Sequence, residues 1–164
     1  MSKASSALEG RIVAVFNTAS GSCTPTSGAE AQSIFDAAGL QVDLRVVSPV
    51  DIAETLQEAI AAADVVVVLG GDGTIGRAAT LCGEAGPYLI PLPGGTMNML
   101  PKALYGTADW QSALRAVLAD PHVKAVSGGD AGGHRFFCAA ILGAPSLWAD
   151  AREALRDRDL VAAA

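Results

Sequence analysis

The sequence predicts an α/β fold in which helices cover both faces of a doubly wound, mainly parallel sheet. Apolar runs alternate with segments of helical periodicity between residues 11 and 121, which is the β-α-β order of such folds. Residues 65–69 are four valines and a leucine in succession, a composition typical of a strand buried on both faces. We therefore expect this run to be central, with right-handed crossovers joining the parallel strands.

The other elements of the sheet follow from the same periodicities. Strands are predicted at residues 11–16, 42–47 and 88–92, which are rich in apolar residues. The helices are predicted from three apolar faces, namely Ala31, Ile34, Phe35 and Ala38, then Ile52, Leu56, Ala59, Ile60 and Ala63, then Ile75, Ala78, Ala79 and Cys82. Gly39 stands where a helix-terminating glycine belongs, and Asp51 with Glu54 matches a capping box.

A further helix and a hairpin are predicted after the sheet. Asp109 leads a helix whose core face includes Trp110 and which ends at residues 120–121, Asp-Pro. Residues 123–126 and 135–142 are predicted strands around the glycine-rich stretch 128–133. A phosphate-binding role for this stretch is the alternative to a plain hairpin turn, which we favour because no helix start follows it. Ser146 heads a last predicted amphipathic helix.

Charge and composition exclude several classes of function. Eleven basic and seventeen acidic residues give a formal charge of −6. Electrostatic binding to nucleic acid or to an anionic membrane is therefore not expected. No apolar run approaches the ~18 residues that span a bilayer, and no signal peptide is visible, so we expect a cytoplasmic protein whose membrane contact is at most transient. Cys23, Cys82 and Cys138 are expected to be reduced thiols, and His122 and His134 to be surface residues.

The segment Gly70–Thr74, with the sequence Gly-Gly-Asp-Gly-Thr, directly follows the central strand, and a helix is predicted from about Thr74. Glycine lets a ligand approach the main chain, and a helix N-terminus favours negative charge through its N–H groups and dipole. Strand, glycine turn and helix start together therefore indicate a phosphate site. The alternative is a tight turn that uses glycine for geometry alone, since the sequence is neither GxxxxGK[ST] nor GxGxxG.

Three further segments are expected at the same edge of the sheet. Residues 17–22 follow the first strand, Ser48 ends the second, and residues 93–98, Pro-Gly-Gly-Thr-Met-Asn, follow the strand at 88–92. The carboxyl ends of parallel strands meet at one edge, where ligands of such sheets bind. We therefore expect these segments to surround one ligand together with Gly70–Thr74.

Two of these segments resemble a known group of kinases. Gly-Gly-Asp-Gly-Thr resembles the nucleotide-binding loop of diacylglycerol kinases, sphingosine kinases, bacterial YegS-like lipid kinases and NAD kinases, and residues 93–98 resemble the Pro-x-Gly-Thr-x-Asn segment of the lipid kinases. At the position of residues 93–98, NAD kinases are expected to carry an Asn-Glu pair and a different glycine loop. An NAD kinase is therefore the weaker alternative. The resemblance covers residues 11–143, essentially the nucleotide-binding half of these enzymes.

This resemblance implies transfer of the ATP γ-phosphoryl group to a lipid hydroxyl, of diacylglycerol or sphingoid type, with ATP and Mg²⁺ as cofactors. The implied nucleotide-binding residues are Asn17, Ser48, Gly70, Gly71, Asp72, Gly73, Thr74, Ile75, Gly76, Gly95, Thr96 and Asn98. Asp72 is also the catalytic candidate, and it either orders the loop or holds a magnesium-bound water, because a carboxylate repels phosphate. Ser48 equally fits a strand-end serine, and Asn17, Ser20 and Gly21 match a family loop in which proline replaces Thr18.

The resemblance also implies two domains, with residues 11–121 as the nucleotide-binding domain and residues 122–164 as the opening of a β-sandwich lipid-binding domain. Most of that second domain is absent, so we expect a fragment, and a nucleotide-binding module without activity of its own is the alternative function. Unpaired strand edges and the apolar stretch 136–142 predict self-association into a homo-oligomer. Gly76 and Arg77 depart from the family's Asn-Glu, so Arg77 either pairs with phosphate or is a solvated surface residue.

Overall fold

The parallel sheet is the centre of the molecule, whose computed structural model describes residues 8–137. Its strands are β1 (Ile12–Asn17), β2 (Val42–Val47), β3 (Val65–Gly70) and β4 (Tyr88–Pro93), in the order β2-β1-β3-β4. All neighbouring pairs are parallel. β1 and β3 are interior and every residue in them is buried, so the predicted central position of the valine run is confirmed.

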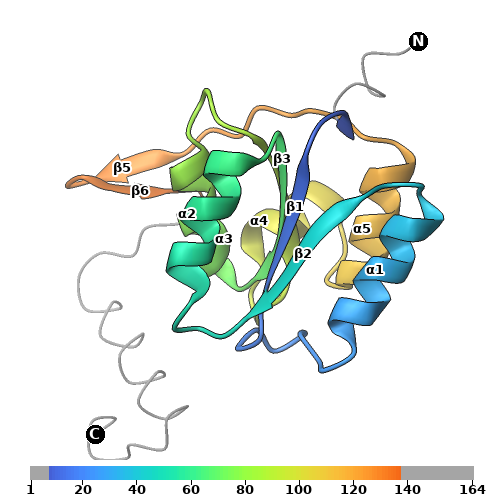
Figure 1. The fold of residues 1–164 in the computed structure, drawn as a ribbon. Helices are drawn as coiled ribbons and strands as arrows, with labels where there is room; N and C mark the ends of the chain where they lie inside the picture. The colour runs from blue at the N-terminus through green and yellow to red at the C-terminus, as the bar shows by residue number, and fades with distance from the viewer. Residues whose placement is uncertain (1–7, 138–164) are drawn as a thin grey trace, which may run out of the picture.

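Helices cover both faces of this sheet, as predicted for a doubly wound fold. They are α1 (Ser27–Ala37), α2 (Ile52–Ala62), α3 (Asp72–Cys82), α4 (Met99–Tyr105) and α5 (Trp110–Ala119). Figure 1 shows α1 and α5 on one side of the sheet and α2 and α3 on the other. Because side chains alternate along a strand, Phe16 joins the core under α1 and α5, whereas its neighbour Val15 joins the core under α2 and α3.

Several predicted local features are confirmed. Gly39 ends α1 with a φ of +70°, and the N–H groups of Gly39 and Leu40 donate to the last carbonyls of the helix. Asp109 caps α5, because its carboxylate accepts the N–H of Ser112 at 2.9 Å. Trp110 is a core residue that packs edge-on against Phe16, with ring centroids 5.5 Å apart.

Two local predictions need correction, and the structure adds one helix. The capping box at Asp51 is not formed: Asp51 stands at the N-cap of α2, but its carboxylate accepts the hydroxyl of Ser48 at 2.7 Å and caps no backbone N–H. The helix expected from about Thr74 begins two residues earlier, at Asp72. The short helix α4 was not predicted from the sequence.

The predicted hairpin exists but is shorter and pairs differently. Its strands are β5 (Gly129–Ala131) and β6 (His134–Phe136), which are antiparallel and joined by Gly132 and Gly133. Residues 123–126 form no strand, because the partner of β6 comes from the glycine-rich stretch itself. The hairpin extends from the main body beside α3 (Figure 1). Residues 138–142 of the predicted second strand and the helix headed by Ser146 lie outside the described residues.

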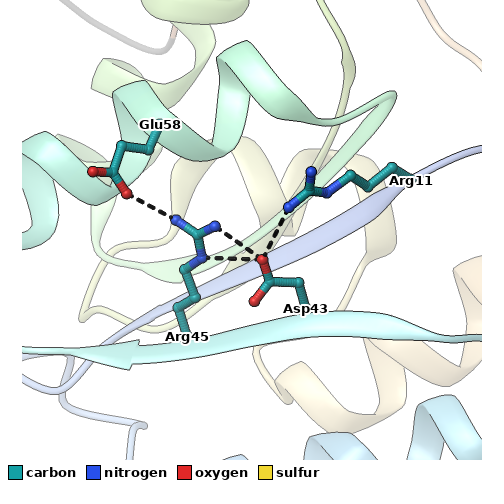
Figure 2. Close-up of polar contacts among 4 residues, drawn as sticks. All are labelled: Arg11, Asp43, Arg45 and Glu58. Atoms are coloured by element: carbon teal, nitrogen blue, oxygen red, sulfur yellow. Dashed lines mark hydrogen bonds and ion pairs between the residues drawn. The ribbon is translucent and has the colours of Figure 1, made fainter.

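Charged residues tie the edge strand β2 to its neighbours (Figure 2). Arg45 donates to Asp43 at 2.9 Å and to Glu58 of α2 at 3.1 Å, and Arg11 approaches Asp43 at 3.5 Å. The hydrogen bond from Arg45 holds the pKa of Asp43 below its usual value. These contacts place charge along an exposed sheet edge, which discourages pairing with another chain.

Other sequence expectations concern single residues. No helix within residues 8–137 is long and apolar enough to cross a membrane. Cys23 and Cys82 are free thiols, and burial raises the pKa of Cys82 to about 11; Cys138 lies outside the described residues. His122 and His134 are exposed, as predicted.

Candidate functional site

Hydrogen bonds join the segments that leave the carboxyl ends of the four strands. The N–H of Thr18 donates to Val47 at the end of β2, and the N–H of Ser22 donates to the carbonyl of Gly94 after β4. The side-chain amide of Asn17, the last residue of β1, donates to the hydroxyl of Thr74 at 3.2 Å. The structure therefore brings the predicted segments together at one edge of the sheet.

The loops after β3 and β4 lie closer to each other than residues with a Cβ would permit. A Cβ on Gly94 would stand 2.8 Å from the backbone nitrogen of Gly70, and one on Gly95 would stand 2.7 Å from the Cα of Gly71. The N–H of Gly94 also donates to the carbonyl of Gly70 at 3.0 Å. Gly94 and Gly95 are therefore required for the close approach of two main chains. Backbone conformation is not the reason, because neither residue has a positive φ.

Asp72 connects the first of these loops to α4. Its two carboxylate oxygens accept the N–H groups of Asn98, at 3.0 Å, and Met99, at 2.7 Å. These N–H groups belong to the N-terminus of α4, where helix geometry leaves donors without partners. Asp72 therefore stabilises α4 and fixes the loop before it, which is the loop-ordering role among the two expected for this residue.

Asn98 holds the second loop in shape. It is the one non-glycine residue with a positive φ in the described part of the chain, at +52°. Its amide nitrogen and oxygen form hydrogen bonds of 2.7 Å with the carbonyl and N–H of Gly95, and it is 3% exposed. Asparagine tolerates this left-handed conformation better than most residues, so Asn98 closes a tight turn that presents Thr96 at its exposed tip.

The N-terminus of α3 is left without a side-chain cap. Gly71 is its N-cap residue and has an extended backbone. The acidic side chain of the first turn, Asp72, serves α4 instead. The N–H groups at the start of a helix have no partner within the helix and carry the positive end of its dipole, so residues 71–74 offer donors to an anion.

The remaining predicted site residues have distinct surroundings. Gly73 and Gly76 border open space, so nothing hinders a ligand there. Ile75 is buried in the core, and its N–H donates to the carbonyl of Gly71. Ser48 lies at the end of β2, where its hydroxyl donates to Asp51. Ser20 is buried, with no partner for its hydroxyl among the described residues.

A cleft between α3 and the hairpin adjoins this site, and sequence reasoning missed it. Its volume is about 620 Å³, and its lining includes Asp72, Gly73, Gly76 and Arg77 on one side and Arg135 on the other. The hairpin prediction indicated two strands, but no sequence pattern indicated that they fold back onto α3. The cleft therefore connects the loop after β3 with the hairpin.

Residues 8–137 contain no cluster of side chains of the kind that binds a metal ion. Within residues 8–137 there is no group of three or more histidine, cysteine, aspartate or glutamate side chains that could hold a metal ion. Both carboxylate oxygens of Asp72 accept backbone N–H groups. The described residues thus contain no preformed metal site of three such ligands, and we assign no step to magnesium.

One family profile and several solved structures match this chain. The family profile of the diacylglycerol kinase catalytic domain matches residues 11–130. The crystal structure of a diacylglycerol kinase from Bacillus anthracis strain Sterne aligns with a TM-score of 0.65 at 24% identity, over 78% of this chain and 46% of that one. Another structure from that strain, also assigned as a diacylglycerol kinase, aligns with a TM-score of 0.64 at 25% identity, over 77% and 47%. The chain spans less than half the length of these structures, and no curated protein sequence matches it.

Proposed function

The chain belongs to the diacylglycerol kinase catalytic domain family, and from this premise we propose that it forms the nucleotide-binding half of an ATP-dependent lipid kinase. Such an enzyme transfers the γ-phosphoryl group of ATP to the hydroxyl of a lipid, here of diacylglycerol or sphingoid type. The acceptor is proposed from the family alone. The observation that carries the nucleotide half is the uncapped N-terminus of α3 beside two closely packed glycine loops.

The uncapped start of α3 supports phosphate binding because the nearby carboxylate, that of Asp72, accepts N–H groups of another helix. An aspartate in the first turn would ordinarily satisfy its own helix N-terminus. Asp72 is turned instead toward Asn98 and Met99, so the donors of residues 71–74 remain for a ligand. Phosphoryl transfer needs mainly positioning and charge stabilisation, and these donors can supply both to the ATP phosphates.

The other residues of the edge divide into two proposed roles. Thr96 is exposed at the tip of the second loop, and we assign its hydroxyl to direct contact with the nucleotide. Asn17, Asp72 and Asn98 each form hydrogen bonds that hold the loops, and we assign them to positioning. Asp72 thus contributes through loop geometry and carries no assigned proton transfer.

Calorimetric titration of the full chain with Mg-ATP tests the proposal, with Mg-NAD as the comparison ligand. Saturable binding of ATP alone is expected. Thr96→Ala should weaken it about two- to tenfold, the effect of one lost hydrogen bond. Ser33→Ala, which removes an exposed hydroxyl from the middle of α1, is the matched control and should leave the affinity unchanged.

A lipid kinase assay with radiolabelled ATP then tests the transfer reaction, with diacylglycerol and sphingosine in mixed micelles as acceptors. Labelled phospholipid from either acceptor would establish the transfer reaction and identify the acceptor class. ATP binding without any labelled lipid would instead identify a nucleotide-binding module. NAD binding with formation of NADP would overturn the lipid kinase proposal.

A further inference from the structure

The cleft between α3 and the hairpin carries cationic side chains on both of its walls. Arg77 lines it from the second turn of α3, and Arg135 lines it from β6. We propose that these two arginines form a clamp that grips one phosphate group from opposite sides. The inference rests on the proposed function, because it extends the same nucleotide edge, and it assigns to Arg77 the phosphate role rather than the surface role.

Both arginines are available for a ligand. Each is exposed, and neither forms an ion pair or a side-chain hydrogen bond with another residue in the range 8–137, whereas Arg11 and Arg45 both pair with Asp43. A guanidinium presents donors in a planar fork that matches two phosphate oxygens. Two such forks facing one cleft are a suitable arrangement for a phosphate with several free oxygens.

The charge of the cleft contrasts with that of the whole chain. The chain has a formal charge of −6, yet the cleft lining contains two arginines and one acidic residue, Asp72. Asp72 has both oxygens engaged by backbone N–H groups, which offset its charge locally. Phe136 and Phe137 add apolar surface to the cleft lining.

The clamp is continuous with the uncapped start of α3. Asp72 and Gly73 belong both to the first turn of this helix and to the cleft lining, and Gly73 and Gly76 leave open space beside it. A phosphate on the N–H groups of residues 71–74 therefore lies next to the clamp. The ligand chemistry is a phosphate with several free oxygens, and its source is either the polyphosphate of a nucleotide or the head group of a phosphorylated lipid.

Titration calorimetry on the full chain tests the clamp with three probes: Mg-ATP, inorganic tripolyphosphate and soluble dihexanoyl phosphatidic acid. The variants are Arg77→Ala, Arg77→Lys and Arg135→Ala. Arg115→Ala, an exposed arginine on α5 across the sheet, is the control with the same change in charge. Thermal unfolding by circular dichroism verifies that each variant is folded.

We expect Arg77→Ala and Arg135→Ala each to weaken binding of tripolyphosphate about tenfold, Arg77→Lys to weaken it less, and Arg115→Ala to leave it unchanged. An equal loss for ATP identifies the nucleotide as the source, and a loss for phosphatidic acid without one for ATP identifies the lipid. Unchanged affinity for all probes in both alanine variants, or an equal loss in Arg115→Ala, overturns the clamp. If the wild-type chain binds tripolyphosphate or phosphatidic acid through both arginines but fails to bind ATP, the nucleotide function fails while the clamp stands.

Discussion

The molecule has two glycine-rich regions that use glycine for opposite physical reasons. At the edge of the parallel sheet, Gly94 has no positive φ, but a Cβ on it would stand 2.8 Å from the backbone nitrogen of Gly70. In the hairpin, Gly132 and Gly133 have φ values of +63° and +85° with nothing within 4 Å of a Cβ. Glycine is thus required by close approach at Gly94 and by backbone conformation at Gly132 and Gly133.

The aspartates of the two regions differ in how far along the chain their hydrogen-bond donors lie. Asp72 reaches across 26 and 27 positions of the chain to the N–H groups of Asn98 and Met99. Asp130 accepts the N–H of Gly133, three positions away in its own turn, at 2.8 Å. The sheet edge is therefore held together by long-range contacts that bring main-chain donors to one place. The hairpin is a local structure, and Gly132 and Gly133 shape only its turn.

The largest effect that would test this contrast is expected from Gly94→Ala. The new methyl group would meet the backbone of Gly70, which cannot rotate away as a side chain can, so we expect a loss of about 1–3 kcal/mol in the free energy of unfolding. Affinity for Mg-ATP should fall with it, because both glycine loops must shift. Urea denaturation and calorimetric titration measure the two effects.

Gly76→Ala is the matched control for that substitution. Gly76 lies inside α3 with open space around its Cβ position, and alanine is the better helix former by about 0.5–1 kcal/mol. The free energy of unfolding should therefore rise. Equal destabilisation by the two substitutions would contradict the close-approach explanation.

A smaller effect is expected from removal of the long-range carboxylate. Asp72→Ala leaves the N–H groups of Asn98 and Met99 without their acceptors, which should lower the free energy of unfolding by about 1–2 kcal/mol. Hydrogen exchange at α4 should accelerate, because this helix loses its N-terminal partner. Asp130→Ala is the control from the local turn, and it should leave the exchange at α4 unchanged. Acceleration at α4 by both variants would refute the role given to Asp72.

The sequence was sufficient where local patterns decide the structure. The valine run of β3, the core position of Trp110 and the termination of α1 at Gly39 all follow from neighbouring residues, and the structure confirms them. The convergence of the loops at one sheet edge was also predictable, because parallel topology places the strand ends together. These features need no knowledge of which distant residues touch.

The sequence was insufficient where a distant or competing partner decides. Helix α4 is short and contains Pro101, and its N-terminus depends on Asp72, which no local pattern connects to it. The capping box at Asp51 fails because the backbone of Asp51 is helical (φ −90°, ψ −14°) and not extended as in a capping residue, and its carboxylate accepts the Ser48 hydroxyl instead. The pattern of residues 123–142 predicts strands that are too far apart, because it assigns the whole glycine stretch to the turn, although two adjacent glycines between short strands are themselves typical of a two-residue turn.

The smallest effect is expected in that two-residue turn, from Gly132. A positive φ at both loop residues is typical of a type I′ turn, which accepts glycine or asparagine but strains other residues. Gly132→Ala should therefore cost about 1 kcal/mol in the stability of the hairpin, whereas Gly132→Asn should cost much less, although asparagine is the larger side chain. Hydrogen exchange of the β5–β6 amides measures the difference. Because the site around Gly132 is open, an asparagine variant that opens faster than the alanine variant would show that space, rather than φ, limits this glycine, and the distinction between the two regions would fail.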